Sequence, residues 1–305
     1  MNRISLRKRL LEWYKRQGRA TLPWRTVRDP YRTLVSEFML QQTQVDRVLP
    51  KFEAFVTRFP TVAALADASG ADVLREWKGL GYNARALRLH RVARAVMEHH
   101  GGVIPQDISD LRALPGIGAY TAAAIRAFAF DLDDAPIDTN VRRVVHRLAF
   151  GIEYPAAATV RELDESARSL VPRGNAHDWN SALMDLGSAI CTARAPKCLL
   201  CPLQPDCAAT PIDASALEGA RERYAKPRSP QEAMPFERTT RYARGRVIDR
   251  LRELPPGQRI SLLDLHRSLE AALPGRSADE VGGFVAALER DGLVKRDGDR
   301  VALAD

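Results

Sequence analysis

The sequence predicts an all-α domain followed by a small α+β domain. Over residues 1–213 the apolar side chains recur at helical spacing, and the alternation typical of strands is nearly absent. From residue 236 the pattern changes to three helices and a terminal hairpin. Residues 211–235 lose this periodicity among Pro, Glu, Ala and Arg, which indicates a linker. We therefore expect a helical domain over 1–210 and a winged-helix-like domain over 236–305.

The helices of the front part are expected to follow one another with short turns between them. The N-terminal stretch up to Arg19 is basic and amphipathic. Asp29-Pro30 combines an N-cap with proline at the first helical position, and apolar residues from Leu34 to Met39 then recur at helical spacing. Further helices are expected at 46–58, 71–77, 84–99, 107–113, 119–129, 139–149, 157–170 and 177–190.

The C-terminal domain is expected to contain three helices and a two-stranded hairpin. The first helix buries the apolar residues between Val247 and Leu251, and a Pro-Pro-Gly turn at 255–257 follows it. Ser261 begins the second helix, and the capping box at 277–280 begins the third. Asp297-Gly298 marks the hairpin turn.

Composition and charge predict a globular protein with an anionic partner. The 305 residues are 45% hydrophobic and 28% charged, as in packed proteins. The net charge is +8 and comes mainly from residues before Ala214, which favours nucleic acid as the partner. The sequence contains neither an apolar signal core nor the roughly 18 consecutive apolar residues of a membrane span. We expect a soluble, monomeric, cytoplasmic protein associated with the nucleoid and without a membrane partner.

The C-terminal domain carries little of this positive charge on its third helix. The segment ADEVGGFVAALER is acidic and has no Lys or Arg before Arg290. A helix that enters a major groove presents hydrogen-bond donors and positive charge, so we do not expect this helix to read DNA sequence. Lys295 and Arg296 in the wing are the residues there that could contact phosphate.

All four cysteines fall in one short run with the spacing C-x6-C-x2-C-x5-C. Such clustering in a cytosolic chain indicates a metal centre rather than disulfides. Zinc sites usually show two close pairs, whereas this run has one, so the spacing favours an iron–sulfur cluster over zinc. The expected ligands are Cys191, Cys198, Cys201 and Cys207.

A glycine turn and two carboxylic acids are the remaining candidates for chemistry. Pro115-Gly116-Ile117-Gly118 precedes a helix N-terminus, where backbone amides can approach a phosphate, although an ordinary helix–helix loop would use the same residues. Glu37 lies among apolar residues on its helix, and the alternative to a functional role is a solvated glutamate. Asp138 is a natural N-cap, and amides and the helix dipole stabilise its anion there.

Taken together, these motifs resemble the adenine DNA glycosylase (MutY) family of helix-hairpin-helix glycosylases that carry a 4Fe–4S cluster. The resemblance covers about residues 8–208 in the order found in the family. It implies a two-lobed fold, with a six-helix lobe at about 30–137 and a cluster lobe formed by the N-terminal helix and 138–210. The matching stretches are TLPWRTVRDPYRTLVSEFMLQQTQV, GLGY, LPGIGAYTAAAI, IDTNVRR, ALMDLGSAIC and the cysteine run.

The resemblance also implies catalytic roles. Glu37 would protonate the departing adenine, since a desolvated carboxyl keeps its proton near neutral pH. Asp138 would stabilise an oxocarbenium-like sugar or add to it, with Asn140 and Tyr120 as supporting hydrogen-bond donors. In the related endonuclease III branch a lysine at the place of Tyr120 forms a Schiff base, which a tyrosine cannot do. The enzyme is therefore expected to remove the base without strong lyase activity.

The resemblance further implies a set of DNA contacts in two groups. The glycine turn would clamp the DNA backbone, and polar residues elsewhere would fill the gap left by a flipped nucleotide. The implied contacts are Gly116, Gly118, Gln41, Gln42, Thr43 and Tyr82. The chain departs from the family where Asn83 replaces the usual aromatic, and where the tail does not resemble the Nudix-type domain of typical members.

Three functions are compatible with these observations. The first is excision of adenine mispaired with guanine or 8-oxoguanine in double-stranded DNA, by hydrolysis of the N-glycosidic bond. The second is excision of thymine or uracil at G mispairs by a glycosylase. The Gln41-Gln42-Thr43 run and Tyr82 favour adenine over these two bases. The third is a non-catalytic cluster protein that binds damaged DNA, against which Glu37, Asp138 and Asn140 argue together.

Overall fold

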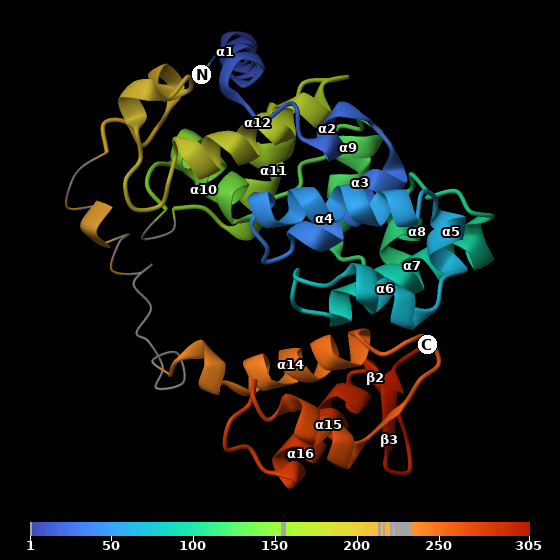
Figure 1. Cartoon of the computed structure of the whole chain (residues 1–305). Helices are drawn as coiled ribbons and strands as arrows, with labels where there is room; N and C mark the ends of the chain where they lie inside the picture. Colours follow the sequence, from blue (N-terminus) through green and yellow to red (C-terminus); the bar gives the residue numbers. More distant parts are fainter. Residues whose placement is uncertain (1, 154–156, 213–214, 216, 220–221, 223–233) are drawn as a thin grey trace. The chain divides into compact units, whose positions relative to one another are not determined.

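The computed structural model describes residues 2–153, 157–212, 215, 217–219, 222 and 234–305. The described part is mostly helical and has a small sheet near its C-terminus (Figure 1). Within these residues no helix is long and apolar enough to cross a membrane. The chain divides into two compact units. The first consists of Met1–Glu37 and Ile104–Pro227, and the second of Phe38–Val103 and Arg228–Asp305.

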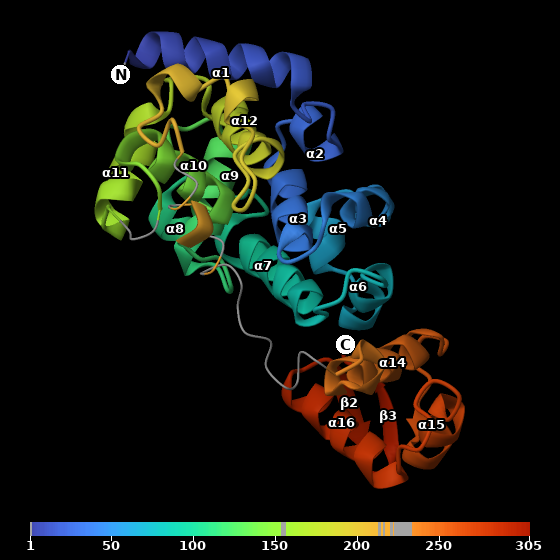
Figure 2. The same ribbon diagram turned by 90° about the vertical axis from the view of Figure 1, so that its left-hand side faces the viewer.

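The first unit is a helical bundle centred on its last long helix, α12. This helix packs against α1, α9 and α10, and Figures 1 and 2 show α1 beside it. Trp179 and Leu186 of α12 are fully buried in the core that results. The elements are α1 (Arg3–Gln17), α2 (Pro23–Thr26), α8 (Ile108–Ala113), α9 (Ala119–Ala129), α10 (Thr139–Phe150), α11 (Val160–Leu170), α12 (Ala176–Ala189), η1 (Cys198–Leu200) and η2 (Gln204–Asp206).

Helix α3 (Pro30–Leu40) begins in the first unit, and its last residues belong to the second. Asp29 caps it as expected, since its Oδ1 accepts a hydrogen bond from the Arg32 amide at 2.7 Å. The front half of the second unit then contains α4 (Val45–Arg58), α5 (Val62–Ala66), α6 (Gly70–Glu76) and α7 (Ala84–His100).

The C-terminal segment completes the second unit with three helices around a three-stranded antiparallel sheet. The strand order is β1-β3-β2, and Val294 of β2 lies opposite Leu303 of β3. Helix α14 packs against α15 and α16. The elements are η3 (Phe236–Arg238), α14 (Thr240–Arg252), β1 (Ile260–Ser261), α15 (Leu262–Leu269), α16 (Ala278–Arg290), β2 (Val294–Asp297) and β3 (Arg300–Leu303).

This segment is anchored on α6 and on the loop before α7. The buried Arg252 of α14 donates through Nε to the Leu74 carbonyl at 2.7 Å and through Nη2 to Asn83 Oδ1 at 2.8 Å. A Cβ at Gly70 would lie 2.9 Å from the Ala304 carbonyl oxygen. Because glycine has no side chain, the C-terminal end of the chain can pack closely against the start of α6. Residues 38–103 and the C-terminal segment are therefore one compact unit. The domain boundaries at 210 and 236 stay predictions.

The sequence places most helices within a few residues of their observed bounds. The helix expected around 157–170 begins at Val160, because Thr159 forms a capping box with Glu162 there. Helices α2 and α5 were not expected, since four and five residues are too few for a periodic pattern. Strand β1 was also missed, because its two residues depend on pairing with distant β3.

Candidate active site

Glu37 is buried on α3, with an exposed fraction of 8%. Burial is the largest influence on its carboxyl and raises its pKa to about 7, with a further contribution from the charge of Asp138. A hydrogen bond from Tyr120 and the charge of Arg25 act in the opposite direction. Glu37 therefore retains its proton in part at neutral pH, as a general acid must.

Tyr120 reaches Glu37 because of the glycine turn that precedes it. Gly118 is the N-cap of α9, so Tyr120 is the second residue of the helix and lies beside the turn. Its hydroxyl donates a hydrogen bond to the Glu37 carboxyl. Burial, with the charges of Glu37 and Asp138, raises the pKa of Tyr120 well above its ordinary value. The phenol therefore stays a neutral hydrogen-bond donor.

Asp138 is the N-cap of α10, as its sequence position predicts. Its Oδ1 accepts a hydrogen bond from the Val141 amide at 2.7 Å, and its Oδ2 accepts one from Asn140 Nδ2 at 3.1 Å. Asn140 Oδ1 in turn accepts from Arg143 Nη2 at 2.8 Å. These contacts orient the Asn140 amide and fix both oxygens of Asp138.

Close packing of α12 against α10 holds this arrangement in place. Arg143 is buried and donates to the Gly187 and Cys191 carbonyls, both at 2.6 Å. A Cβ at Gly187 would lie 2.7 Å from Asn140 Cβ, closer than side chains approach one another. Glycine is therefore required at 187 for the two helices to meet at Asn140.

Arg25 and Asp185 form an ion pair beside these residues that the sequence did not indicate. Arg25 Nη1 lies 2.8 Å from Asp185 Oδ2, and the Arg19 amide and Nε also donate to Asp185, both at 2.8 Å. The Arg25 charge partly offsets the burial that raises the pKa values of Glu37 and Tyr120. A buried aspartate on the inner face of α12 was the available signal, because such a residue needs a cation.

The first unit thus brings together Glu37, Tyr120, Asp138 and Asn140, the four residues proposed from the sequence for catalysis. Gly116 and Gly118 lie in the turn that ends beside them. Gly116 has a φ of +84°, a conformation that favours glycine. A Cβ at Gly118 would meet no atom within 4 Å, so the backbone there is open to a close approach.

The predicted contacts Gln41, Gln42, Thr43 and Tyr82 lie in two loops of the second unit. Gln42 and Tyr82 have φ values of 56° and 46°, left-handed conformations that are uncommon for residues other than glycine. Strained backbone of this kind persists where surrounding contacts fix it, and it gathers at functional sites.

Arg85 supplies those contacts and was missed by the sequence analysis. Only 2% exposed, it donates to the carbonyls of Phe38 and Met39 in the last turn of α3 and of Gln41 in the loop that follows. It also donates to the Leu80 and Gly81 carbonyls in the other loop, at 3.2 and 3.1 Å. Its position on the apolar face of α7, one turn before Leu89, was the signal, since a charge there needs buried partners.

The four cysteines are half-buried in the loop that contains η1 and η2. Burial, with a smaller contribution from the negative charge of the other three thiolates, raises the pKa of Cys201 to about 11. Arg147 Nη1 lies 3.7 Å from Cys191 Sγ. Among the residues that the structure describes, no three Cys, His, Asp or Glu side chains are arranged to hold a metal ion.

Comparisons with known proteins found a matching family model and similar relatives. A family model described as HhH-GPD superfamily base excision DNA repair protein matches residues 35–172. The adenine DNA glycosylase of Mycolicibacterium smegmatis is 40% identical over 299 residues, which are 97% of this chain and 94% of that protein. The adenine DNA glycosylase of Mycobacterium tuberculosis is 43% identical over 245 residues, 80% of this chain and 77% of that protein.

Two solved structures are similar to the chain in fold. A thermostable thymine-DNA glycosylase matches with a TM-score of 0.61 and 31% identity, over 67% of this chain and 94% of that one. Endonuclease III in a non-covalent complex with DNA matches with a TM-score of 0.56 and 21% identity, over 74% of this chain and 100% of that one. The second likeness concerns the fold alone.

Proposed function

This chain belongs to the adenine DNA glycosylase family of the HhH-GPD superfamily, and we propose that it excises adenine mispaired with guanine or 8-oxoguanine from double-stranded DNA. The bond broken is the N-glycosidic bond, and the products are free adenine and an abasic site. The observation that carries the proposal is the buried contact between Glu37 and Tyr120 near Asp138, the N-cap of α10.

Each of these residues has a step in the reaction. Glu37 gives its proton to a ring nitrogen of adenine, which then leaves with the electron pair of the C1′–N bond. The positive charge that develops on the sugar is stabilised by the Asp138 carboxylate. Water adds to C1′, and its proton returns to the ionised Glu37. Asn140 holds Asp138 in place, and Tyr120 holds Glu37.

The same geometry supports base removal without strand cleavage. A lyase step needs an amine to form an imine with the opened sugar. The residue beside Glu37 and Asp138 is Tyr120, whose phenol cannot form one.

We propose that Cys191, Cys198, Cys201 and Cys207 are the ligands of a 4Fe–4S cluster, which their C-x6-C-x2-C-x5-C spacing supports. The thiols are close enough to raise one another's pKa values, and a cationic centre would relieve the repulsion between their thiolates. When bound, the cluster supplies a redox-active cross-link of the loop. Iron analysis of anaerobically purified protein should give roughly four irons per chain. Zinc in equal molar amount without iron would contradict this assignment.

The substrate is tested by identifying the base that is released. Chromatography of the free bases should detect adenine from duplexes that contain A opposite G or 8-oxoguanine. Duplexes with T or U opposite G serve as the comparison, since the similar thymine-DNA glycosylase makes that activity the alternative. Release of thymine or uracil in preference to adenine would overturn the proposal, and release of no base would favour a DNA-binding protein without catalysis.

A further inference from the structure

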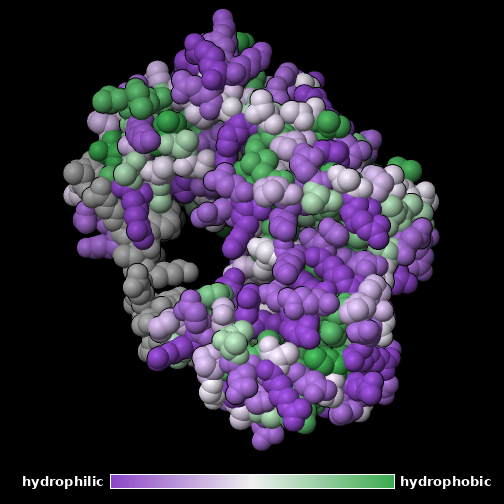
Figure 3. All heavy atoms as spheres, viewed as in Figure 1, coloured by the Kyte–Doolittle hydropathy of each residue, from purple (hydrophilic) through white to green (hydrophobic). Residues whose placement is uncertain are grey.

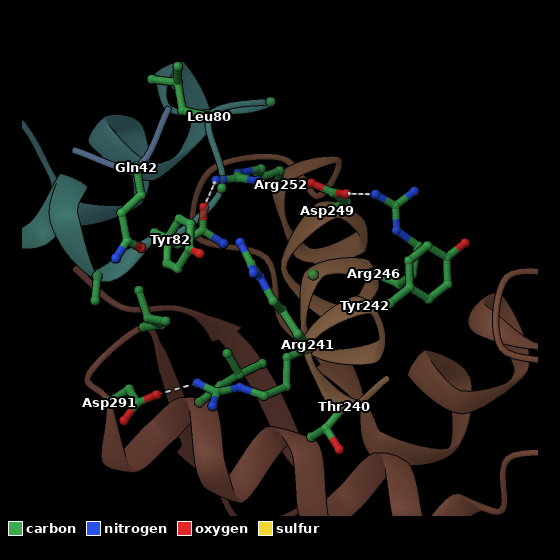
Figure 4. A pocket seen from close by; sticks show the side chains of 18 of the residues that line it. Gln42, Leu80, Tyr82, Thr240, Arg241, Tyr242, Arg246, Asp249, Arg252 and Asp291 are labelled. Carbon is green, nitrogen blue, oxygen red and sulfur yellow. Dashed lines mark hydrogen bonds and ion pairs between the residues drawn. The ribbon is translucent and has the colours of Figure 1, made fainter. Parts of the chain in front are cut away.

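The second unit contains a pocket of about 670 Å³ that the catalytic proposal does not use. Figure 4 shows that Gln42 and Tyr82 line it from the segment 38–103, and that Arg241, Tyr242 and Arg246 line it from α14. All of its lining residues belong to the second unit. The C-terminal segment therefore builds one wall of a pocket whose other wall carries two of the predicted DNA contacts.

The pocket lining is strongly basic. It contains more arginines than carboxylates, and each carboxylate is already engaged. Asp249 binds both Arg246 and Arg252, and Asp291 binds Arg244. Among the described residues no carboxylate pairs with the three exposed arginines that remain. Those arginines are Arg47, Arg88 and Arg241.

Arg241 is held by a stacking contact rather than by an ion pair. Its guanidinium carbon lies 4.1 Å from the centre of the Tyr82 ring. Figure 4 shows Arg241 extending from α14 toward Tyr82. The stack orients the guanidinium but leaves its charge uncompensated, because a ring is a weak partner for a full positive charge.

The rim of the pocket is rigid. Gln42 and Tyr82 keep left-handed backbone conformations, and Arg85 ties their two loops together. Arg252 fixes the next residue, Asn83, through a 2.8 Å hydrogen bond. A preformed basic pocket of this kind suits a fixed anionic group, because little conformational entropy is lost on binding.

We propose that this pocket binds the sugar-phosphate backbone of DNA, with Arg241 of α14 as a phosphate contact, so that the C-terminal segment is part of the DNA-binding surface. The proposal rests on the proposed function, which supplies DNA as the ligand. Phosphate is favoured over a base because Arg241 already covers the Tyr82 ring, on which a base would have to stack. The planar guanidinium fork matches phosphate oxygens.

The charge distribution of the C-terminal segment supports α14 as the contacting element. This helix carries Arg241, Arg244 and Arg246 into the pocket lining, whereas α16 is acidic in its first turn and contributes only Leu288. Figure 3 shows hydrophilic residues over α14 and α6 on the face drawn. Contact with DNA is therefore assigned to α14 rather than to the third helix of the winged-helix-like segment.

The test measures how binding depends on salt. The full-length protein is titrated with a fluorescent, fully paired duplex and with an A·G duplex whose adenosine resists cleavage, from about 50 to 300 mM salt. Each lost phosphate contact lowers the slope of log Kd against log salt by about 0.9. Arg241→Gln should show this decrease on both duplexes, because phosphate contacts carry no sequence information. Its Kd should rise roughly 3- to 10-fold at 100 mM salt.

Two control variants separate the charge from other effects. Arg267→Gln removes an exposed arginine of the same unit outside the pocket lining, and it should keep the wild-type slope. Arg241→Lys should also keep that slope, since it retains a positive charge that binds phosphate.

The proposal is overturned if Arg241→Gln has the wild-type slope, or if Arg267→Gln loses as much as Arg241→Gln. It is also overturned if the lysine variant behaves as the glutamine variant does. This test measures binding to DNA and not catalysis. A failure to release adenine would therefore refute the proposed function but would not decide whether Arg241 contacts phosphate.

Discussion

At the residue scale, the proposed chemistry depends on the protonation of Glu37 and Tyr120. Glu37 and Tyr120 are buried together, and burial works against ionisation of both. A carboxyl with a pKa of about 7 can donate a proton near neutral pH, whereas an exposed glutamate would already be ionised. The neutral phenol of Tyr120 helps to hold this carboxyl in one position.

Replacing the acid should separate binding from chemistry. Glu37→Gln keeps the shape of the side chain but has no acidic proton, so adenine release should fall at least ~100-fold. Affinity for a mispaired duplex should stay within a few-fold of wild type. Single-turnover rates and binding isotherms measure the two quantities, and a rate near that of wild type would return Glu37 to the role of an ordinary buried glutamate.

The raised pKa of Glu37 also predicts how stability depends on pH. Between the ordinary value of 4.5 and about 7, the folded chain holds a proton that the unfolded chain has released. The free energy of unfolding therefore falls as pH rises through this range, by an amount on the order of 3 kcal/mol. Glu37→Gln removes this dependence.

The measurement compares thermal unfolding of the two proteins at pH 5 and pH 8. The variant should gain stability relative to the wild type at the higher pH. An equal difference at both pH values would show that Glu37 titrates normally, and it would remove the physical basis of the acid assignment.

At the element scale, the candidate active site depends on helix ends and on one close helix–helix contact. The N-terminus of α9 presents Tyr120, and the N-terminus of α10 presents Asp138. Helix α12 approaches α10 at Gly187. Arg143 of α10 donates there both to the Gly187 carbonyl and to Asn140 Oδ1. Small displacements of α12 should therefore reach the Asp138 carboxylate.

Gly187→Ala tests this coupling. The new Cβ would lie 2.7 Å from Asn140 Cβ, so α10 and α12 must separate and the hydrogen bond from Asn140 to Asp138 should weaken. We expect a loss of about 1–3 kcal/mol in stability and a slower release of adenine with DNA affinity retained. The matched control is Gly283→Ala in α16, where no atom lies within 4 Å of the new Cβ. A control that loses as much activity as Gly187→Ala would contradict the coupling.

The elements themselves could largely be predicted from the sequence, because helical periodicity and capping are local signals. Asp138 and Ser277 are examples, since each caps the helix that its position indicates. The partners of buried charges could not be predicted in this way. Arg25 pairs with Asp185 across 160 residues, and Arg85 binds carbonyls more than 40 residues away. Such pairs depend on tertiary packing, which periodicity does not encode.

At the scale of the whole molecule, the two compact units have different tasks in this account. The first unit contains the residues proposed for base removal, together with the cysteine loop. The second contains the basic pocket to which the C-terminal segment contributes α14. A sequence reading that treats the C-terminal segment by itself misses this pocket, because the lining combines residues near 42 and 82 with residues near 241.

The central claim is that this glycosylase removes adenine and leaves the strand intact. It is tested most directly on a duplex with adenine opposite 8-oxoguanine, end-labelled on the adenine strand and incubated with the wild-type protein. Denaturing gels are run with and without alkali. Since Tyr120 cannot form an imine, we predict an uncut strand before alkali and cleavage at the adenine position after it. Cleavage before alkali, or an intact strand after alkali, would contradict the account.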